Sequence, residues 1–231
     1  LQLLWISLMM RRYLPWAMGV AMLSFLLLFT PLALAETPVS MGESLNDTEL
    51  ISIGLGDTLA NDDSIQSSVS WNGNLVLFTS LATNLVPTDT NDAVDVFLRN
   101  REAGTTERIS RRANGGQVND SSGGAMMNPI GTLFTYYSYA TNVVLSDTNG
   151  FSDLFVVSRD PDTSAITVGR LSMGFDGSEA NGDSFLSDLT DDGNRIVFDS
   201  FANNLIPADE NTWSDIFMYD ATAETMEKLS I

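Results

Sequence analysis

Residues 78–97 read FTSLATNLVPTDTNDAVDVF, and this stretch decides the fold because the chain repeats it. The pattern returns at residues 136–155 as YYSYATNVVLSDTNGFSDLF and at residues 198–217 as FDSFANNLIPADENTWSDIF. The copies are offset by 58 and then by 62 residues. Recurrence at a nearly fixed period indicates a structural repeat, in which each unit stacks on its neighbours.

A second marker shows where each repeat ends. It occurs as Leu50-Ile-Ser52, Arg108-Ile-Ser110, Arg170-Leu-Ser172 and Lys228-Leu-Ser230. The spacing from each of the first three serines to the Phe of the next Asp-x-Phe is constant, so the extra residues of the middle repeat fall in one loop, around residues 159–163. The repeats therefore span about residues 53–110, 111–172 and 173–231.

Within each repeat the apolar runs are short, rich in β-branched and aromatic residues, and bounded by turn residues. In the first repeat we expect strands at residues 68–71, 75–78, 96–98 and 105–110, with a tight turn at Asn72-Gly73. No helical periodicity appears after residue 48. The sequence thus predicts an all-β protein, a β-propeller of four-stranded antiparallel blades with three repeats present.

A unit with an Asp-Gly turn, Ala-Thr-Asn-Leu-Val, Asp-Thr-Asn, Asp-Val-Phe and a final Arg-Ile-Ser resembles the TolB-type, WD-repeat-like propeller blades of exported bacterial proteins. The resemblance covers about residues 49–231 and implies the fold. The middle repeat departs from it, because Asn128-Pro-Ile-Gly131 replaces the Asp-Gly turn. TolB also carries an N-terminal α/β domain for which this chain has no room, so its role in the cell envelope is not implied.

The strand count predicts an incomplete ring. The final Ile-Ser or Leu-Ser strand occurs four times and the other strands three times, while propellers typically have about four to eight blades. Either the blades belong to a longer array, or two or more chains assemble a ring as a homo-oligomer. The first interpretation is favoured because an unpaired terminal strand is an aggregation hazard.

The first 35 residues have the features of an export signal. Arg11 and Arg12 precede an uncharged stretch, residues 13–35, that ends in Ala33-Leu-Ala35. This pattern predicts a signal peptide over residues 1–35 and a periplasmic or secreted protein. The alternative is an uncleaved signal anchor, in which case the protein would contact a membrane. Residues 36–47 are polar and predict a linker before the propeller of residues 48–231.

Composition excludes several kinds of chemistry. The chain has 11 Lys+Arg, 30 Asp+Glu, no His and no Cys, and its formal net charge is −19. Without imidazole or thiol it cannot form a Ser-His-Asp triad, a Cys-His pair or a His/Cys metal site. Its acidity argues against a nucleic-acid partner, which needs clustered basic residues. The Gly-x-Ser-x-Gly elbow of serine hydrolases is also absent.

One repeated polar motif is a candidate metal site. Oxygen-bearing side chains recur as Asp-x-Asn-x3-Asp, a spacing that could bring them together on Ca²⁺, which binds about six to eight oxygens. The alternative is that the motif closes Asx turns and starts the next strand. No other cofactor is expected. The candidate ligands are Asp89, Asn91, Asp95, Asp147, Asn149, Asp153, Asp209, Asn211 and Asp215.

A second repeated motif lies in the connections that lead into each blade. Such connections line one mouth of a propeller and could contact a protein or a small ligand, although solvated acidic turns would look the same. The candidate residues are Asn61, Asp62, Asp63, Asn119, Asp120, Asn181 and Asp183.

The basic residues and the tryptophans of the repeats are expected to be structural. The cluster Arg99, Arg101, Arg108, Arg111 and Arg112 is predicted to pair with nearby carboxylates for little stability per pair. Trp71 and Trp213 are predicted to pack in the core or between blades.

Taken together, these features predict an exported, non-catalytic propeller that acts as a binding or scaffolding module for a protein or ligand. No catalytic residues are predicted, because turn carboxylates alone do not define the opposed pair that a glycosidase needs. The alternative is the propeller portion of a hydrolase, a peptidase or a glycosidase, whose catalytic part lies outside this chain.

Overall fold

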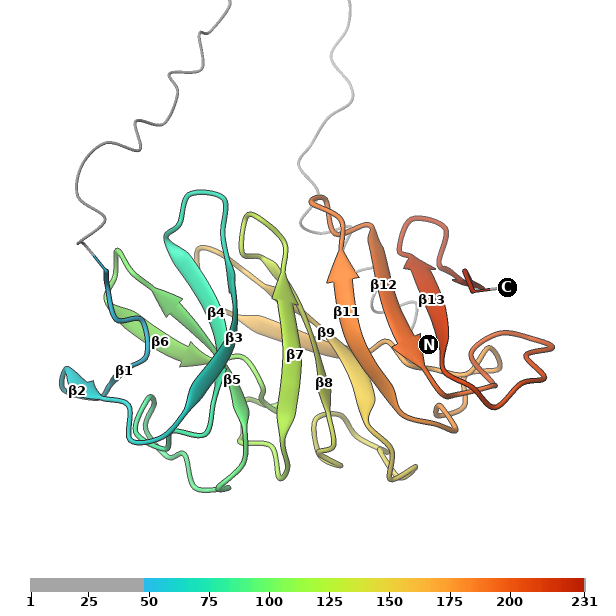
Figure 1. Ribbon diagram of the computed structural model, residues 1–231, viewed down its shortest axis with the longest axis horizontal. Coiled ribbons are helices and arrows are strands. Elements are labelled where there is room, and N and C mark those ends of the chain that lie inside the picture. Colours follow the sequence, from blue (N-terminus) through green and yellow to red (C-terminus); the bar gives the residue numbers. More distant parts are fainter. Residues whose placement is uncertain (1–47, 231) are drawn as a thin grey trace, which may run out of the picture. The chain divides into compact units, whose positions relative to one another are not determined.

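The computed structural model describes residues 48–230, and the predicted signal peptide and linker lie outside these residues. The regular elements of the described part are all β-strands (Figure 1). The same residues contain no helix long and apolar enough to cross a membrane. The described chain is therefore all-β, as predicted from the repeats.

The strands form three four-stranded antiparallel sheets in which neighbours along the chain pair, and these sheets are the predicted blades. Blade 1 contains β3 (Ser64–Val69), β4 (Leu75–Ser80), β5 (Asp95–Asn100) and β6 (Thr105–Arg108). Blade 2 contains β7 (Ser122–Met127), β8 (Leu133–Ser138), β9 (Asp153–Arg159) and β10 (Ile166–Arg170). Blade 3 contains β11 (Ser184–Leu189), β12 (Arg195–Ser200), β13 (Asp215–Asp220) and β14 (Thr225–Lys228).

A short hairpin precedes each blade. Before blade 1 it consists of β1 (Ile53–Gly54) and β2 (Thr58–Leu59). Before blades 2 and 3 a single bridge closes it, Arg111 to Gln117 and Met173 to Glu179. The extra residues of the middle repeat extend the β9–β10 hairpin, because β9 has 7 residues where β5 and β13 have 6.

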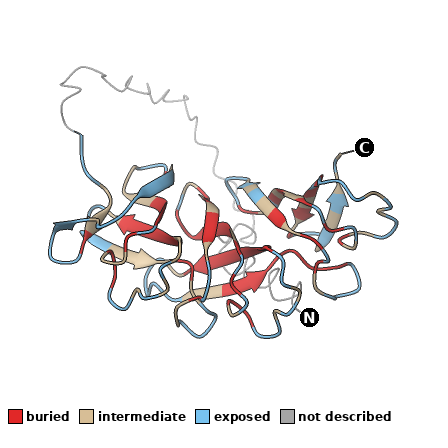
Figure 2. Ribbon diagram, turned by 60° about the horizontal axis from the view of Figure 1, so that its bottom comes forward, coloured by how far each residue is buried: buried red, intermediate tan, exposed pale blue. Residues whose placement is uncertain are grey.

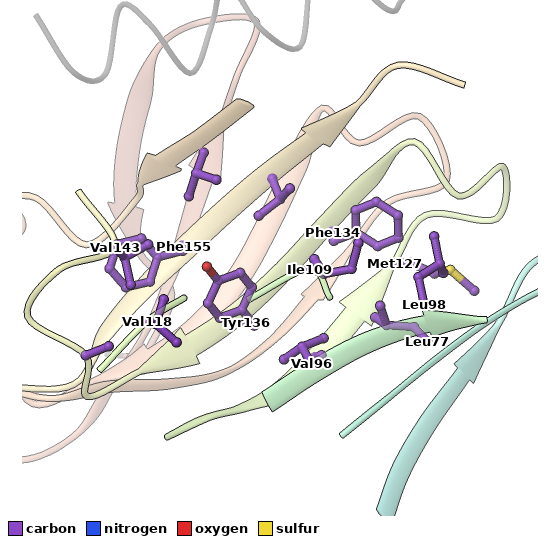
Figure 3. Close-up of a cluster of buried hydrophobic side chains, with 14 of the residues drawn as sticks. Leu77, Val96, Leu98, Ile109, Val118, Met127, Phe134, Tyr136, Val143 and Phe155 are labelled. Atoms are coloured by element: carbon purple, nitrogen blue, oxygen red, sulfur yellow. The ribbon is translucent and has the colours of Figure 1, made fainter. Parts of the chain in front are cut away.

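Neighbouring blades pack face to face, and two of the three buried clusters of the described residues lie in the junctions between blades. At the junction of blades 1 and 2, Leu77 and Leu98 belong to the same buried cluster as Phe134, Tyr136 and Phe155 (Figure 3). A second cluster at the junction of blades 2 and 3 includes Leu154 and Val156 of blade 2 together with Phe198, Phe217 and Tyr219 of blade 3. Because blade 2 is covered on both faces, all of β9 is buried.

The turn at residues 128–131 keeps the conformation of its counterparts although its sequence departs from the repeat. Gly131 has a φ of 69°, and Gly73 and Gly193 both have 70°. In each turn the glycine amide donates to the carbonyl three residues earlier, as Gly131 does to Asn128 at 2.9 Å. A positive φ is the requirement that the three turns share, and glycine meets it at no steric cost.

Two details of the sequence prediction are wrong. The first strand of blade 1 runs over Ser64–Val69 and ends before Trp71, instead of spanning residues 68–71. Trp71 and Trp213 are not packed in the core, since they are 87% and 78% exposed. Trp71 lies in the turn between β3 and β4 and Trp213 in the loop before β13, so neither has a sheet on which to pack. Figure 2 shows exposed loops of this kind around the buried strands.

Candidate functional site

Each blade holds a side-chain cation between two aspartates of the predicted metal motif. In blade 2, Nη1 of Arg170 lies 2.7 Å from Oδ2 of Asp153, 3.3 Å from Oδ1 of Asp147 and 2.8 Å from Oε1 of Glu179. The Arg170 side chain is only 2% exposed. The Arg170 guanidinium is thus buried among three carboxylates.

The Asp-x-Asn-x3-Asp turn fixes this arrangement. Asn149 accepts the amide of Phe151 at 3.0 Å and donates to Asp153 at 3.2 Å. Ser172 Oγ donates to the other oxygen of Asp153 at 2.6 Å. Ser146 has a φ of 66°, and its carbonyl accepts a bond from Arg170 at 3.4 Å. The Asx turn of the alternative interpretation is therefore present, and it holds the carboxylates in position around the cation.

The same arrangement occurs in the other two blades. Arg108 Nη1 lies 3.0 Å from Asp95 and 3.3 Å from Asp89. Lys228 Nζ lies 2.6 Å from Asp215 and 3.0 Å from Asp209. The predicted pairing of Arg108 with nearby carboxylates is confirmed. Arg170 is buried and the Arg108 side chain is only 10% exposed, so these are not weak surface pairs.

The carboxylates differ in pKa because their surroundings differ. Burial, followed by repulsion from Asp153, outweighs the attraction of Arg170 and raises the pKa of Asp147 to about 6. Burial also raises the pKa of Asp153 despite its bonds to Arg170 and Ser172. In blade 3 the hydrogen bond from Lys228 is the largest influence on Asp215, and it outweighs desolvation and lowers the pKa of this carboxyl.

In each blade a side-chain cation already lies where the predicted calcium ion would bind. The nine predicted ligands do converge, three in each blade, but an arginine or lysine of the same blade already lies between the carboxylates. Within residues 48–230 no group of three or more Asp or Glu side chains is placed to hold a metal. Calcium binding stays a prediction, and Ca²⁺ would have to displace a bonded cation.

We accordingly expect the midpoint of thermal unfolding to be the same in excess Ca²⁺ and in EDTA. A ligand that binds only the folded state raises stability with its concentration, so the comparison reports binding directly. Mg²⁺ at the same ionic strength is the control for screening. A rise in the midpoint specific to Ca²⁺ would contradict this expectation and restore the metal interpretation.

The asparagines of the second predicted set lock the blade connections in place. Asn119 donates to Thr141 Oγ1 at 3.0 Å and accepts the Thr141 amide at 3.0 Å, while its own amide donates to Asn142 Oδ1 at 3.0 Å. Asn61 and Asn181 make the equivalent bonds, with the residue pairs 83–84 and 203–204. Because the side-chain oxygen and one N–H of each asparagine are bonded within the blade, these three residues hold the mouth in position.

The aspartates of that set lie at one edge of the blades, beside an apolar residue that the sequence prediction missed. The backbone amide of Tyr139 donates to the backbone carbonyl of Ser121, which follows Asp120. The backbone amide of Phe201 donates to the backbone carbonyl of Asp183. In blade 1 the equivalent residue is Leu81, and its backbone amide donates to the backbone carbonyl of Asp63, which follows Asp62. These apolar side chains are exposed, Leu81 by 38%, Tyr139 by 45% and Phe201 by 49%. We call this edge the acidic mouth.

An aromatic cluster lies on the acidic mouth where blades 2 and 3 meet. The Phe185 ring lies 5.3 Å from Tyr137 and 6.1 Å from Tyr139, centroid to centroid. Partial burial, then the charges of Asp183 and Asp120, raise the pKa of Tyr139. An exposed aromatic ring beside two carboxylates can bind a cation by cation–π attraction and ion pairing. The signal in the sequence was the apolar residue before each Ala-Thr-Asn or Ala-Asn-Asn.

Comparison with known proteins gives matches in structure only. No family model matches the chain, and no curated protein matches it in sequence. Similar solved structures include putative TolB from Agrobacterium tumefaciens, with 16% identity, a TM-score of 0.43 and coverage of 78% of this chain and 50% of that one. The β-propeller domain of the Trilobed protease from Pyrococcus furiosus has 15% identity, a TM-score of 0.42 and coverage of 75% and 45%.

The acylaminoacyl peptidase of Pyrococcus horikoshii is 12% identical, with a TM-score of 0.42, and the match covers 73% of this chain and 25% of the peptidase. This chain therefore spans half or less of the length of these three proteins. The three four-stranded antiparallel sheets of the described residues, which repeat along the chain, are what confirm the expected propeller blades.

Proposed function

We propose that this propeller module is exported, has no catalytic activity of its own and binds cationic segments of a protein partner at the acidic mouth. The observation that carries the proposal is the exposed ring of Tyr139, packed against Phe185 and flanked by Asp120 and Asp183. Export rests on the signal-peptide pattern of residues 1–35.

The chemistry of the mouth suits an arginine or lysine side chain. A guanidinium over the face of a tyrosine gains about 0.5–1 kcal/mol at an exposed site, and adjacent carboxylates add ion pairs. Both features occur together at the junction of blades 2 and 3. The formal net charge of −19 also attracts a basic partner over a longer range.

A binding role is supported further by how the other acidic groups are used. The carboxylates of the Asp-x-Asn-x3-Asp turns are each bonded to a cation of their own blade, and the arrangement occurs three times. A catalytic group is needed once, so a group present in every blade is better explained by structure. The mouth, in contrast, has its aromatic cluster at a single junction.

The test is the affinity for a short oligo-arginine peptide, measured by calorimetry at physiological salt. We expect Tyr139→Leu and Asp183→Asn each to weaken binding about two- to fivefold, the size of one exposed cation–π contact or ion pair. In the parent protein the Asp183 carboxylate accepts a hydrogen bond from the Ser152 backbone amide at 2.7 Å. The side-chain oxygen of Asn can accept the same bond, so we expect Asp183→Asn to preserve the fold.

Two variants serve as matched controls. Tyr139→Phe keeps the ring and is expected to bind like the parent protein. Asp162→Asn removes one charge from the exposed β9–β10 turn and is expected to have a smaller effect than Asp183→Asn. Equal weakening by Asp162→Asn and Asp183→Asn would show that the peptide senses only the net charge, and the proposed site would be rejected.

A further inference from the structure

The hairpin before blade 2 differs from the other two hairpins at two positions of the repeat. Blades 1 and 3 have a glycine at the first position and a residue with a hydroxyl group at the second. Blade 2 has an arginine at the first and a glycine at the second. The equivalent pairs, in chain order, are Gly54 and Thr58, Arg112 and Gly116, and Gly174 and Ser178.

In blades 1 and 3 the hairpin binds the asparagine of the loop that follows the second strand. The side-chain amide of Asn204 donates to the Glu179 carbonyl at 2.8 Å and to Ser178 Oγ at 3.2 Å. Asn84 makes the same two bonds in blade 1. A Cβ at Gly174 would lie 2.8 Å from Nδ2 of Asn204. A side chain at this position is therefore incompatible with an asparagine amide bonded in this way.

In blade 2 the arginine takes the place of the asparagine amide. Nε of Arg112 donates at 2.7 Å to the carbonyl of Gln117, which is equivalent to that of Glu179. The side-chain oxygen of Asn142 accepts the Asn119 amide at 3.0 Å. Among the contacts of residues 48–230, neither the side-chain NH2 of Asn142 nor the terminal nitrogens of Arg112 donate a hydrogen bond. Two groups of donors thus stay available in this blade.

The hairpin of blade 2 also docks one residue further along its loop. The backbone amide of Phe175 donates to the carbonyl of Asn204 at 2.9 Å, and the amide of Leu55 makes the equivalent bond in blade 1. In blade 2 the equivalent amide, that of Ala113, donates to the carbonyl of Val143 at 2.9 Å. Because the side chain of Ala113 is much smaller than that of Leu55 or Phe175, it leaves room beside the loop.

A hollow of about 570 Å³ lies where these differences meet. It is lined by residues 112–114 of the hairpin and residues 141–148 of the loop, which include Arg112, Asn142 and Leu145. The Leu145 side chain is 91% exposed. Blade 2 packs against blade 1 on one face and blade 3 on the other, so the hollow lies inside the array of blades. Its volume is within the range of about 300–1,000 Å³ that is usual for small-molecule sites.

The lining favours a singly charged anion with an apolar part. The guanidinium of Arg112 has the planar fork that matches a carboxylate. Asp147 also lines the hollow, but its carboxylate already contacts Arg170 at 3.3 Å. A phosphate dianion would be repelled by Asp147 more strongly than a carboxylate would be. Ala113 and the exposed Leu145 offer an apolar surface beside the donors.

We propose that this hollow binds a small organic acid. Arg112 and the side-chain amide of Asn142 bind its carboxylate, and Leu145 contacts its apolar part. The differences that leave these donors available occur in one repeat of three, as expected for a ligand site and not for a feature of the scaffold. The proposal goes beyond the acidic mouth and does not depend on it, since the two sites bind charges of opposite sign.

The test is a titration of the purified protein with benzoate, followed by NMR through the side-chain NH2 signals of Asn142. Benzamide, a neutral molecule of nearly the same shape, is the control ligand. We expect benzoate to shift these signals and benzamide to leave them unchanged. Arg112→Gln should raise the dissociation constant for benzoate at least about tenfold, because it removes a charge-assisted, two-pronged hydrogen bond.

Two further variants are matched to Arg112→Gln. Arg112→Gly combined with Gly116→Ser recreates the hairpin of blade 3, so the Asn142 amide should bond the Gln117 carbonyl. We expect this double variant to lose benzoate binding and to keep the midpoint of thermal unfolding of the parent protein. Arg111→Gln removes the same charge one residue earlier, outside the lining of the hollow, and should bind benzoate like the parent.

Three results would overturn the proposal. Asn142 signals that do not move with benzoate would show that no carboxylate binds there. Equal shifts with benzamide would show that only the apolar ring is recognised. Equal weakening by Arg111→Gln and Arg112→Gln would show that benzoate senses only the net charge. Thermal unfolding of each variant separates lost binding from lost folding.

Discussion

We expect Arg170→Met to lower the free energy of unfolding by about 3–5 kcal/mol, the cost of removing one partner from a buried ion pair. Met fills similar space but leaves Asp147, Asp153 and Glu179 without the guanidinium that bonds or contacts each of them. Asp153 is fully buried, so water cannot replace the lost donor. Urea denaturation of the variant and the parent protein measures the difference.

The repeats supply a graded series for the same experiment. The Arg108 side chain is 10% exposed and contacts two carboxylates, and the Lys228 side chain is 19% exposed. We expect the loss to decrease in the order Arg170→Met, Arg108→Met, Lys228→Met, because the cost of an unpaired charge falls with access to water. Arg195→Met is the surface control. The Arg195 side chain, which pairs with Asp220, is 56% exposed, so the loss of this ion pair should cost about 0–1 kcal/mol.

The loss in Arg170→Met should also depend on pH. The folded-state pKa of Asp147 is about 6, above its ordinary value of 3.8, so ionisation of this group favours the unfolded state. Without Arg170 the pKa of Asp147 rises further, and protonation relieves the repulsion. The gap between parent and variant should therefore narrow as the pH falls from 8 towards 5. A loss that is independent of pH, or no larger than that of Arg195→Met, would contradict this account.

The sequence was sufficient to predict the blades, because apolar strands, tight turns and spacing recur in one register. It also predicted that the three Asp-x-Asn-x3-Asp motifs would gather oxygen atoms. It did not identify the cation among them. Arg108 belongs to a marker of the repeat end, and only the register of β5 with β6, in which Phe97 faces Arg108, brings it next to Asp95. Strand register is a tertiary property that a spacing rule does not contain.

The acidic mouth was predicted only in part, because it too depends on tertiary contacts that the spacing of residues does not contain. The acidic turns were recognised because Asn and Asp recur there, but which of their atoms remain available depends on the partner loop. Asn119 is bonded on both sides by residues 141–142, whereas the Tyr139 ring is left exposed. Of two repeated positions at the same mouth, one can be bonded internally and the other exposed, and the sequence pattern alone does not distinguish the two cases.

At Gly182 the sequence repeats and the local geometry give opposite expectations, so a substitution there tests which of the two decides the residue. The equivalent residues are Asp62 and Asp120, so a consensus of the three blades would place Asp at position 182. In the structure, a Cβ at Gly182 would lie 2.7 Å from the carbonyl carbon of Phe201 and 2.8 Å from the amide nitrogen of Ala202. Atoms of a backbone cannot rotate away as the end of a side chain can.

We therefore expect Gly182→Asp to lower the free energy of unfolding by about 1–3 kcal/mol, the usual cost of overpacking. The neighbouring backbone has little freedom to yield, because the Phe201 amide donates to Asp183 at 2.8 Å and the Asn203 amide donates to Asn181 at 3.0 Å.

Asp120→Gly is the reciprocal control, measured by the same urea titration. It removes the bond from the Ser121 amide to Asp120, 2.7 Å long, and adds backbone freedom, for which we expect a loss of about 0.5–1 kcal/mol. If Gly182→Asp proved as stable as the parent protein, the turn before blade 3 would have the freedom of the turn before blade 2. The close approach at Phe201 would then not be what selects glycine at this position.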